Sequence, residues 1–190
     1  MTRAWLAAVA AALAVGLSVP PLRSLIEQSM SWHMVGQMPL LVAAGALAAS
    51  TLPAKALPAS WSSFNQFGLT GFMAAQGVIA YWMLPSAIDR AVVNPGFDVF
   101  KLLTLFASGM LLRGAFQRAP MALQLFFIGY WVSMMCWLGI YFAITDLRLC
   151  NAYSLDSQIA TGWGLLTLGL LLGIVWLGNT WRQVVKKPAS

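Results

Sequence analysis

His33, the only histidine of this 190-residue chain, lies among three methionines in the segment SMSWHMVGQMPLL. On a helix, Met30, Met34 and Met38 recur at every fourth position and share one face, with His33 and Gln37 beside them. Thioether sulfur and imidazole nitrogen suit the soft ion Cu(I), whereas Mg²⁺ or Ca²⁺ would require carboxylates. The segment therefore predicts either a Cu(I) site or an apolar helix face in which the methionines only pack.

Three further side chains belong to the same question. Met83, in the segment YWMLPSAID, is either an apolar anchor or a further thioether ligand. Asp98 and Lys101 are three residues apart, a spacing that allows an ion pair on one helix face. The alternative is two separate charges at the membrane interface, with the long lysine side chain reaching water. Gln37 and Asp98 are candidates for indirect support of a metal site.

No enzyme motif is found in the sequence. The lone histidine cannot form a paired-histidine metal site, and neither a nucleophile elbow nor a glycine-rich phosphate loop is present. Cys136 and Cys150 have no metal-ligand spacing and are expected to be free thiols. The sequence therefore predicts a protein that is not an enzyme.

The composition is that of an integral membrane protein. Hydrophobic residues make up 60% of the chain and charged residues 8%, against about 25% charged in soluble domains. The net charge of +6 comes from basic residues between apolar runs and at the C-terminus, with no basic stripe. Nucleic acid is therefore excluded as a partner, and the lipid bilayer is the predicted environment.

Six apolar segments are long enough to be candidate membrane helices, at about 20 residues per span. They cover residues 5–20, 30–52, 67–84, 97–112, 121–144 and 159–181. We expect one all-α transmembrane domain over residues 1–190, a polytopic helical bundle without internal repeats. The first segment is expected to be a retained helix, because it continues into the next without a clear signal-peptidase site.

Charge asymmetry predicts the orientation. With six spans, seven basic residues fall on the side of the two termini: Arg3, Lys55, Arg113, Arg118, Arg182, Lys186 and Lys187. The opposite side receives four basic residues (Arg23, Arg90, Lys101 and Arg148) and all five acids: Glu27, Asp89, Asp98, Asp146 and Asp156. The positive-inside rule then places both termini in the cytoplasm of a multi-pass protein in a bacterial inner membrane.

Three local signals concern helix geometry. Pro39 lies inside the second segment and lacks an N–H donor, so a kink is expected there. Asn94 followed by Pro95 predicts a helix start. Gly169 and Gly173, in GLLLG, have the small-xxx-small spacing that allows close helix approach, within the chain or in a helix-mediated oligomer.

Three segments, taken in order, resemble the CtaG-like family of multispan membrane proteins associated with assembly of haem-copper cytochrome c oxidase. They are LSVPPLRSLIEQSMSWHMVGQMPLL, YWMLPSAIDRAVVNPGFDVFKLLTLFASGML and TDLRLCNAYSLDSQIATG. The resemblance extends over residues 14–175. It implies an integral membrane assembly factor for such an oxidase, with oxidase subunits as partners. Together with the methionine pattern, it makes His33, Met34, Met38, Met30 and Met83 the candidate Cu(I) ligands.

The sequence also departs from that family. Only His33 remains of the family's histidines; Gln37, Met83, Asp98, Lys101 and Leu102 stand at the other motif positions. Two functions therefore stay open. One is an oxidase assembly factor that handles Cu(I) on the periplasmic side. The other is a metal-free structural or accessory subunit of a respiratory or other membrane complex.

Overall fold

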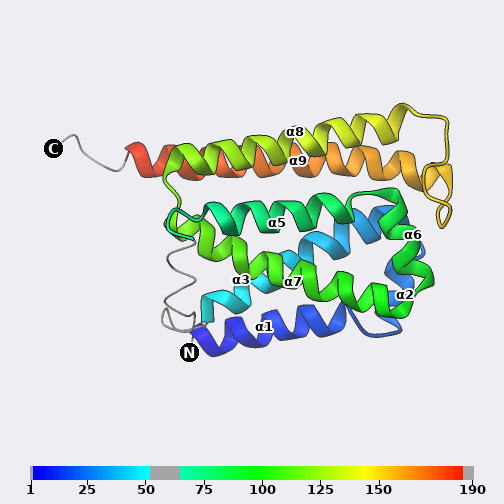
Figure 1. Ribbon diagram of the computed structural model, residues 1–190, viewed down its shortest axis with the longest axis horizontal. Helices are drawn as coiled ribbons and strands as arrows, with labels where there is room; N and C mark the ends of the chain where they lie inside the picture. Colours follow the sequence, from blue (N-terminus) through cyan, green and yellow to red (C-terminus); the bar gives the residue numbers. More distant parts are fainter. Residues whose placement is uncertain (1, 52–64, 186–190) are drawn as a thin grey trace.

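The computed structural model describes residues 2–51 and 65–185, and every regular element within these ranges is helical (Figure 1). The elements are α1 (Thr2–Gly16), α2 (Leu22–Ile26), the π-helix η1 (Trp32–Gln37), α3 (Met38–Thr51), α5 (Leu69–Trp82), α6 (Pro85–Val93), α7 (Pro95–Arg118), α8 (Met121–Ile144) and α9 (Leu155–Val185). The predicted all-α class is confirmed. Residues 52–64, most of the stretch between the second and third predicted segments, lie outside the described residues.

Several of these helices can cross a membrane. Four are long and apolar enough on their own: Trp32–Thr51, Pro95–Arg118, Met121–Ile144 and Leu155–Arg182. Leu69–Trp82 and Pro85–Val93 together pass as a fifth, bent by 73° at the break between them. α1 has 15 residues, about 22 Å of helix against a hydrocarbon core of about 30 Å. The chain is thus consistent with a polytopic helical membrane protein of four to five candidate spans.

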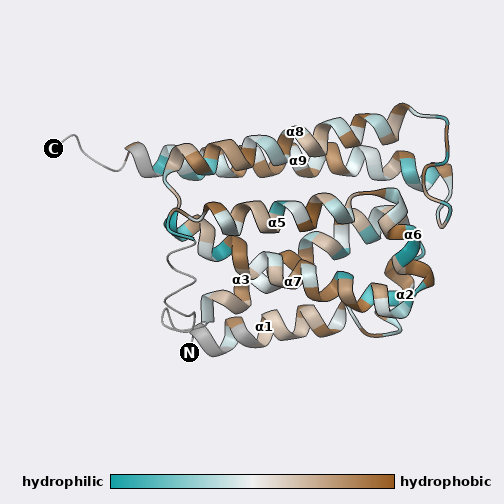
Figure 2. Ribbon diagram, viewed as in Figure 1, coloured by the Kyte–Doolittle hydropathy of each residue, from teal (hydrophilic) through white to brown (hydrophobic). Residues whose placement is uncertain are grey.

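The polar residues lie near the ends of the long helices. α1 begins and α9 ends at the same end of the bundle, and the segments containing α2, α6 and the α8–α9 connection lie at the opposite end (Figure 1). Hydrophilic residues concentrate near both ends, while the helices between them are mostly apolar (Figure 2). We call the end with α2 and α6 the acidic end, because it carries all five carboxylate side chains of the sequence.

Glycines allow the closest helix contacts. A Cβ on Gly45 of α3 would collide with the Phe106 carbonyl of α7, and a Cβ on Gly109 of α7 would collide with the Val42 carbonyl. Gly139 of α8 and Gly162 of α9 have the same relation, with a Cβ at either position under 3 Å from the other's carbonyl oxygen. Backbones therefore touch in both pairs, as small residues permit.

The glycines of the GLLLG motif lie closest to side chains of the neighbouring helix rather than to its backbone. A Cβ on Gly169 would lie 3.0 Å from the Met135 side chain, and a Cβ on Gly173 would lie 3.3 Å from the Val132 side chain, both of α8. The prediction that these glycines pack against a helix is confirmed, and the helix is α8 of the same chain. The predicted start of α7 is confirmed as well, since Asn94 Oδ1 accepts from the N–H of Gly96.

Pro39 explains the π-helix. Its missing N–H cannot bond to the Val35 carbonyl, and its ring crowds that carbonyl in a regular α-helix. The preceding residues adopt the wider i→i+5 pattern instead, in which the Met38 N–H donates to the His33 carbonyl. The predicted distortion thus takes the form of a π-helical segment, which carries both His33 and Gln37. Such segments are frequent at functional sites.

Candidate functional site: a buried polar cluster

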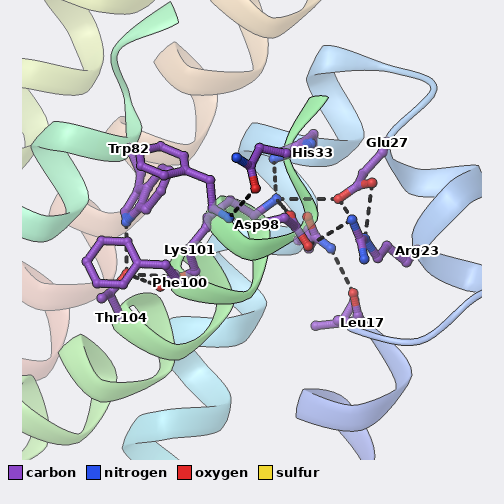
Figure 3. Close-up of polar contacts among 12 residues, drawn as sticks. Leu17, Arg23, Glu27, His33, Trp82, Asp98, Phe100, Lys101 and Thr104 are labelled. Atoms are coloured by element: carbon purple, nitrogen blue, oxygen red, sulfur yellow. Dashed lines mark hydrogen bonds and ion pairs between the residues drawn. The ribbon is translucent and has the colours of Figure 1, made fainter. Parts of the chain in front are cut away.

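Six ionisable side chains meet at the acidic end of the bundle. This buried polar cluster, drawn in part in Figure 3, consists of Arg23, Glu27, His33, Asp98, Lys101 and Tyr153. Its members come from α2 and the turn after it, from η1, from the first turns of α7 and from the α8–α9 connection. Charged groups inside a membrane bundle are costly, and they mark functional or structural sites.

Lys101 is the centre of the cluster. Its Nζ lies 2.6 Å from Asp98 Oδ1, 3.4 Å from Glu27 Oε1 and 2.9 Å from His33 Nε2. The side chains of Asp98 and Lys101 are both 0% exposed. Of the two alternatives for this pair, the ion pair is therefore confirmed, and the prediction of two water-reaching interfacial charges is wrong. The Lys101 side chain is thus fully buried, with contacts to side chains from η1, from the turn after α2 and from α7 itself (Figure 3).

Arg23 completes the charge balance. Its Nη2 lies 2.8 Å from Asp98 Oδ2, and its Nε lies 3.2 Å from both carboxylate oxygens of Glu27. Arg23 and Glu27 remain partly accessible, with 24% and 15% of their side chains exposed. Two cations therefore face two carboxylates, and the cluster has no formal net charge when His33 is neutral. Such mutual pairing offsets the desolvation that burial imposes on each charge.

Both ring nitrogens of His33 are engaged. An ammonium group can only donate, so His33 Nε2 accepts from Lys101 and the ring proton is assigned to Nδ1. Nδ1 then donates to the Tyr153 hydroxyl oxygen, 3.0 Å away. This arrangement links η1 to α7 on one side and to the α8–α9 connection on the other. A metal ion could reach His33 only after displacing one of these two partners.

The five predicted ligands lie in the same part of the molecule. Met30, Met34, Met38 and Met83 all belong to one apolar core cluster, and each is at most 5% exposed. His33 itself is fully buried. Within the described residues, no three His, Cys, Asp or Glu side chains are grouped as metal ligands.

Gln37 makes a separate contact. Its Nε2 donates to the Leu17 carbonyl at 2.7 Å, which ties η1 to the end of α1. Gln37 Oε1 is buried without a hydrogen-bond partner among the described residues. Gln37 thus contacts Leu17, the residue after α1, whereas Asp98 contacts Lys101, the direct partner of His33.

The connection between α8 and α9 positions Tyr153. Asp89 of α6 accepts from the backbone N–H groups of Asn151 and Ala152 at 3.0 and 3.2 Å. Gln158 of α9 accepts from the Leu149 N–H at 2.8 Å through its side-chain oxygen. These contacts fold the connection inward, so that burial raises the pKa of the Tyr153 hydroxyl, with Glu27 adding to the effect. Tyr153 is therefore a neutral hydrogen-bonding group at physiological pH.

Cys150 lies in the same connection. Its thiol is buried, and Sγ lies 3.9 Å from the Pro85 carbonyl. Burial, with a contribution from Asp89, raises the pKa of Cys150 to about 12. The predicted free thiols are confirmed for both cysteines. A protonated, buried thiol is a poor nucleophile, which fits a packing role.

The sequence did not predict that Arg23, Glu27 and Tyr153 belong to this cluster. Arg23 and Glu27 have the i, i+4 spacing of a helical ion pair, so the sequence held a signal for that pair. Tyr153 is 120 residues from His33 along the chain, and no local spacing connects them.

No family model, no curated protein and no solved structure matches this chain.

Proposed function

We propose that this chain is a metal-free accessory factor for assembly of a haem-copper respiratory oxidase in a bacterial inner membrane. The observation that carries the metal-free assignment is the occupation of both His33 ring nitrogens by Lys101 and Tyr153. A copper ion at Nε2 would take the place of an ammonium group and lie close to its positive charge, which is unfavourable in a low-dielectric interior. The oxidase as partner rests on the ordered sequence resemblance.

In this proposal the buried polar cluster replaces a metal as the device that joins the segments. Its balanced charges fix α2, η1, α7 and the α8–α9 connection relative to one another. The protein contributes no catalysis. It presents a rigid set of helix faces to oxidase subunits, or to another membrane complex, while the partner is assembled. Six crossings with both termini in the cytoplasm complete the proposal, supported by the common end at which α1 begins and α9 ends.

A second candidate, transient Cu(I) handling, is supported by the methionines. Met30, Met34, Met38 and Met83 bring four soft thioethers into one apolar cluster, and Cu(I) accepts such ligands. In this case His33 would exchange Lys101 or Tyr153 for the metal when copper is delivered.

One complementation experiment separates the two candidates. In a strain that lacks the gene, oxidase activity per haem in isolated membranes is measured after return of wild type, Met34→Leu/Met38→Leu or Lys101→Met. The metal-free proposal expects the double methionine variant to restore wild-type activity even at limiting copper, because leucine conserves the packing. Lys101→Met is expected to restore little. Wild-type oxidase activity without the gene would refute the oxidase assignment itself.

Copper binding is measured directly by Cu(I) competition titration of the detergent-purified protein, wild type beside His33→Ala. The metal-free proposal expects no competitive binding in either protein. Tight binding that disappears in His33→Ala would establish the copper-handling candidate instead. Purification from native membranes, with copper and oxidase subunits quantified in the same sample, shows which partner accompanies the protein.

A further inference from the structure

An apolar cavity of about 390 Å³ lies between the α8–α9 hairpin and the helices α3, α5 and α7. All five helices contribute to its walls, with Met38, Met83, Leu105, Met135 and Leu168 among the lining residues. Its volume is in the range of about 300–1,000 Å³ that is typical of small-molecule sites. Walls of this kind favour a hydrocarbon chain.

Among the described residues, Arg113 is the only charged one that lines this cavity. It lies on the last turns of α7, at the end of the bundle opposite the acidic end. Within the described residues Arg113 has no ion pair, and Nη1 of Arg118, five residues further along α7, is buried without a partner. All five carboxylate side chains of the sequence lie at the acidic end, so none of them pairs with these arginines.

Trp131 of α8 provides a second polar group. Its side chain lines the same cavity, and the residue is 6% exposed. Its Nε1–H is buried and has no acceptor among the residues that the structure describes. A buried indole N–H normally has a hydrogen-bond partner. The cavity therefore has apolar walls and a cation at its edge, and one of its walls contains a tryptophan whose buried N–H lacks an acceptor among the described residues.

We infer that this cavity is a binding site for an anionic glycerophospholipid. One acyl chain fills the space between the hairpin and the other helices, the phosphate pairs with Arg113, and an ester carbonyl accepts from Trp131 Nε1. The positions of Arg113 and Trp131 along their helices agree with the order of phosphate and ester groups in such a lipid. Arg113 is five residues from the end of α7 at Arg118, and Trp131 is ten residues from the start of α8 at Met121. At 1.5 Å per residue these positions are about 8 and 15 Å from the helix ends, so the donor lies deeper than the cation.

The site is independent of the buried polar cluster and of any oxidase partner. Lipid bound there would join the α8–α9 hairpin to the rest of the bundle across a gap that the side chains leave open. The recognition is specific for charge, because one arginine near a membrane surface favours an anionic lipid by about 1 kcal/mol.

Native mass spectrometry of the full-length, detergent-purified protein tests the inference. Dioleoylphosphatidylglycerol and dioleoylphosphatidylcholine are added separately, and the retained lipid is quantified. We expect wild type to keep one phosphatidylglycerol and Arg113→Gln to keep about fivefold less. Arg182→Gln removes another exposed arginine near the same end and is the matched control, with retention equal to wild type. Trp131→Phe keeps the ring but removes the N–H, and it should also lower retention.

Ala43→Leu, which places a larger side chain into the cavity wall, is expected to abolish retention while the thermal transition of the lipid-free protein is kept. Equal retention of phosphatidylcholine and phosphatidylglycerol by wild type would overturn the inference. So would equal loss in Arg113→Gln and Arg182→Gln, or a copurified molecule without a phosphate in place of the lipid.

Discussion

Lys101 is the residue on which the buried polar cluster depends most. Replacement by Met conserves much of the side-chain volume but leaves Asp98 with Arg23 alone and removes the donor to His33 Nε2. Breaking a buried pair costs about 3–5 kcal/mol, and we expect the lower value because Arg23 still faces Asp98. Reversible unfolding of the detergent-solubilised protein measures this loss in the free energy of unfolding.

Two variants accompany this measurement. Arg90→Met removes an exposed cation of α6 that has no ion pair among the described residues, and it should change the free energy of unfolding by less than about 0.5 kcal/mol. Asp98→Asn/Lys101→Met removes one charge of each sign and should recover part of the stability lost in the single variant. Additive losses in the double variant would mean that Asp98 and Lys101 do not stabilise each other.

The sequence predicted only those side-chain contacts that local spacing encodes. The spacing of three residues on one helix allowed an ion pair between Asp98 and Lys101, beside the alternative of two separate interfacial charges. Their complete burial was not predicted, since it depends on η1 and α2 covering α7. The contact of His33 with Tyr153 likewise depends on how the α8–α9 connection folds inward. Long-range polar contacts require the tertiary arrangement, which hydropathy alone does not determine.

At the scale of elements, α6 anchors the α8–α9 connection through Asp89, which accepts three hydrogen bonds from Asn151 and Ala152. We expect Asp89→Asn to weaken this anchor and to speed alkylation of Cys150 at pH 8 at least tenfold, in a Cys136→Ala background. Two effects act together: the thiol becomes accessible, and its pKa falls from about 12 as burial and the neighbouring carboxylate are lost.

Asp146→Asn is the matched control for the labelling experiment. Asp146 is an exposed carboxylate of the same connection without a hydrogen bond or ion pair in the described part of the chain, so the labelling rate of Cys150 should stay at the wild-type value. Mass spectrometry of the alkylated peptide gives the rate. Fast labelling of Cys150 in the wild-type protein would contradict its burial.

The contact between α3 and α7 depends on Gly109. Gly109→Ala places a Cβ against the Val42 carbonyl and 2.9 Å from the Ala46 nitrogen, so the helices have to separate. We expect a loss of about 3 kcal/mol in unfolding free energy, at the upper end of overpacking effects. Gly114→Ala, on the same helix with nothing within 4 Å of its Cβ position, should instead gain up to about 1 kcal/mol from helix propensity. Equal effects of the two substitutions would disprove the close contact.

Helix-level prediction succeeded where hydropathy carries the signal. The segments predicted at 121–144 and 159–181 correspond to α8 and α9, and the start of α7 followed from Asn94 and Pro95. The sequence did not predict that the distortion before Pro39 would be a π-helix. Proline indicates that one helical hydrogen bond is lost, but it does not indicate which bond replaces it. The 73° bend between α5 and α6 was not predicted either, because the hydropathy pattern gives the length of an apolar segment but not its direction.

At the scale of the whole molecule, the distribution of charge matches the arrangement of the helices. The five acids and the buried polar cluster lie at one end, while Arg113, Arg118 and Arg182 lie toward the other. This separation is the pattern by which basic residues orient membrane proteins. It also leaves the arginine-rich end without carboxylate side chains. Both the predicted cytoplasmic orientation and the inferred lipid site depend on this excess of positive charge.

Cysteine mapping tests the orientation of the complete bundle. In a background without Cys136 and Cys150, single cysteines are introduced at exposed residues: Gln28 and Asp146 at the acidic end, and Gln117 at the other end. A membrane-impermeant maleimide applied to intact spheroplasts should label Gln28→Cys and Asp146→Cys, because the predicted orientation places the acidic end in the periplasm. Gln117→Cys should react only after permeabilisation. Labelling of Gln117→Cys from outside, with protection of the other two, would show the opposite orientation.

Opposite results for Gln28→Cys and Asp146→Cys would show that the helices between them cross the membrane an odd number of times, which excludes the six-span arrangement.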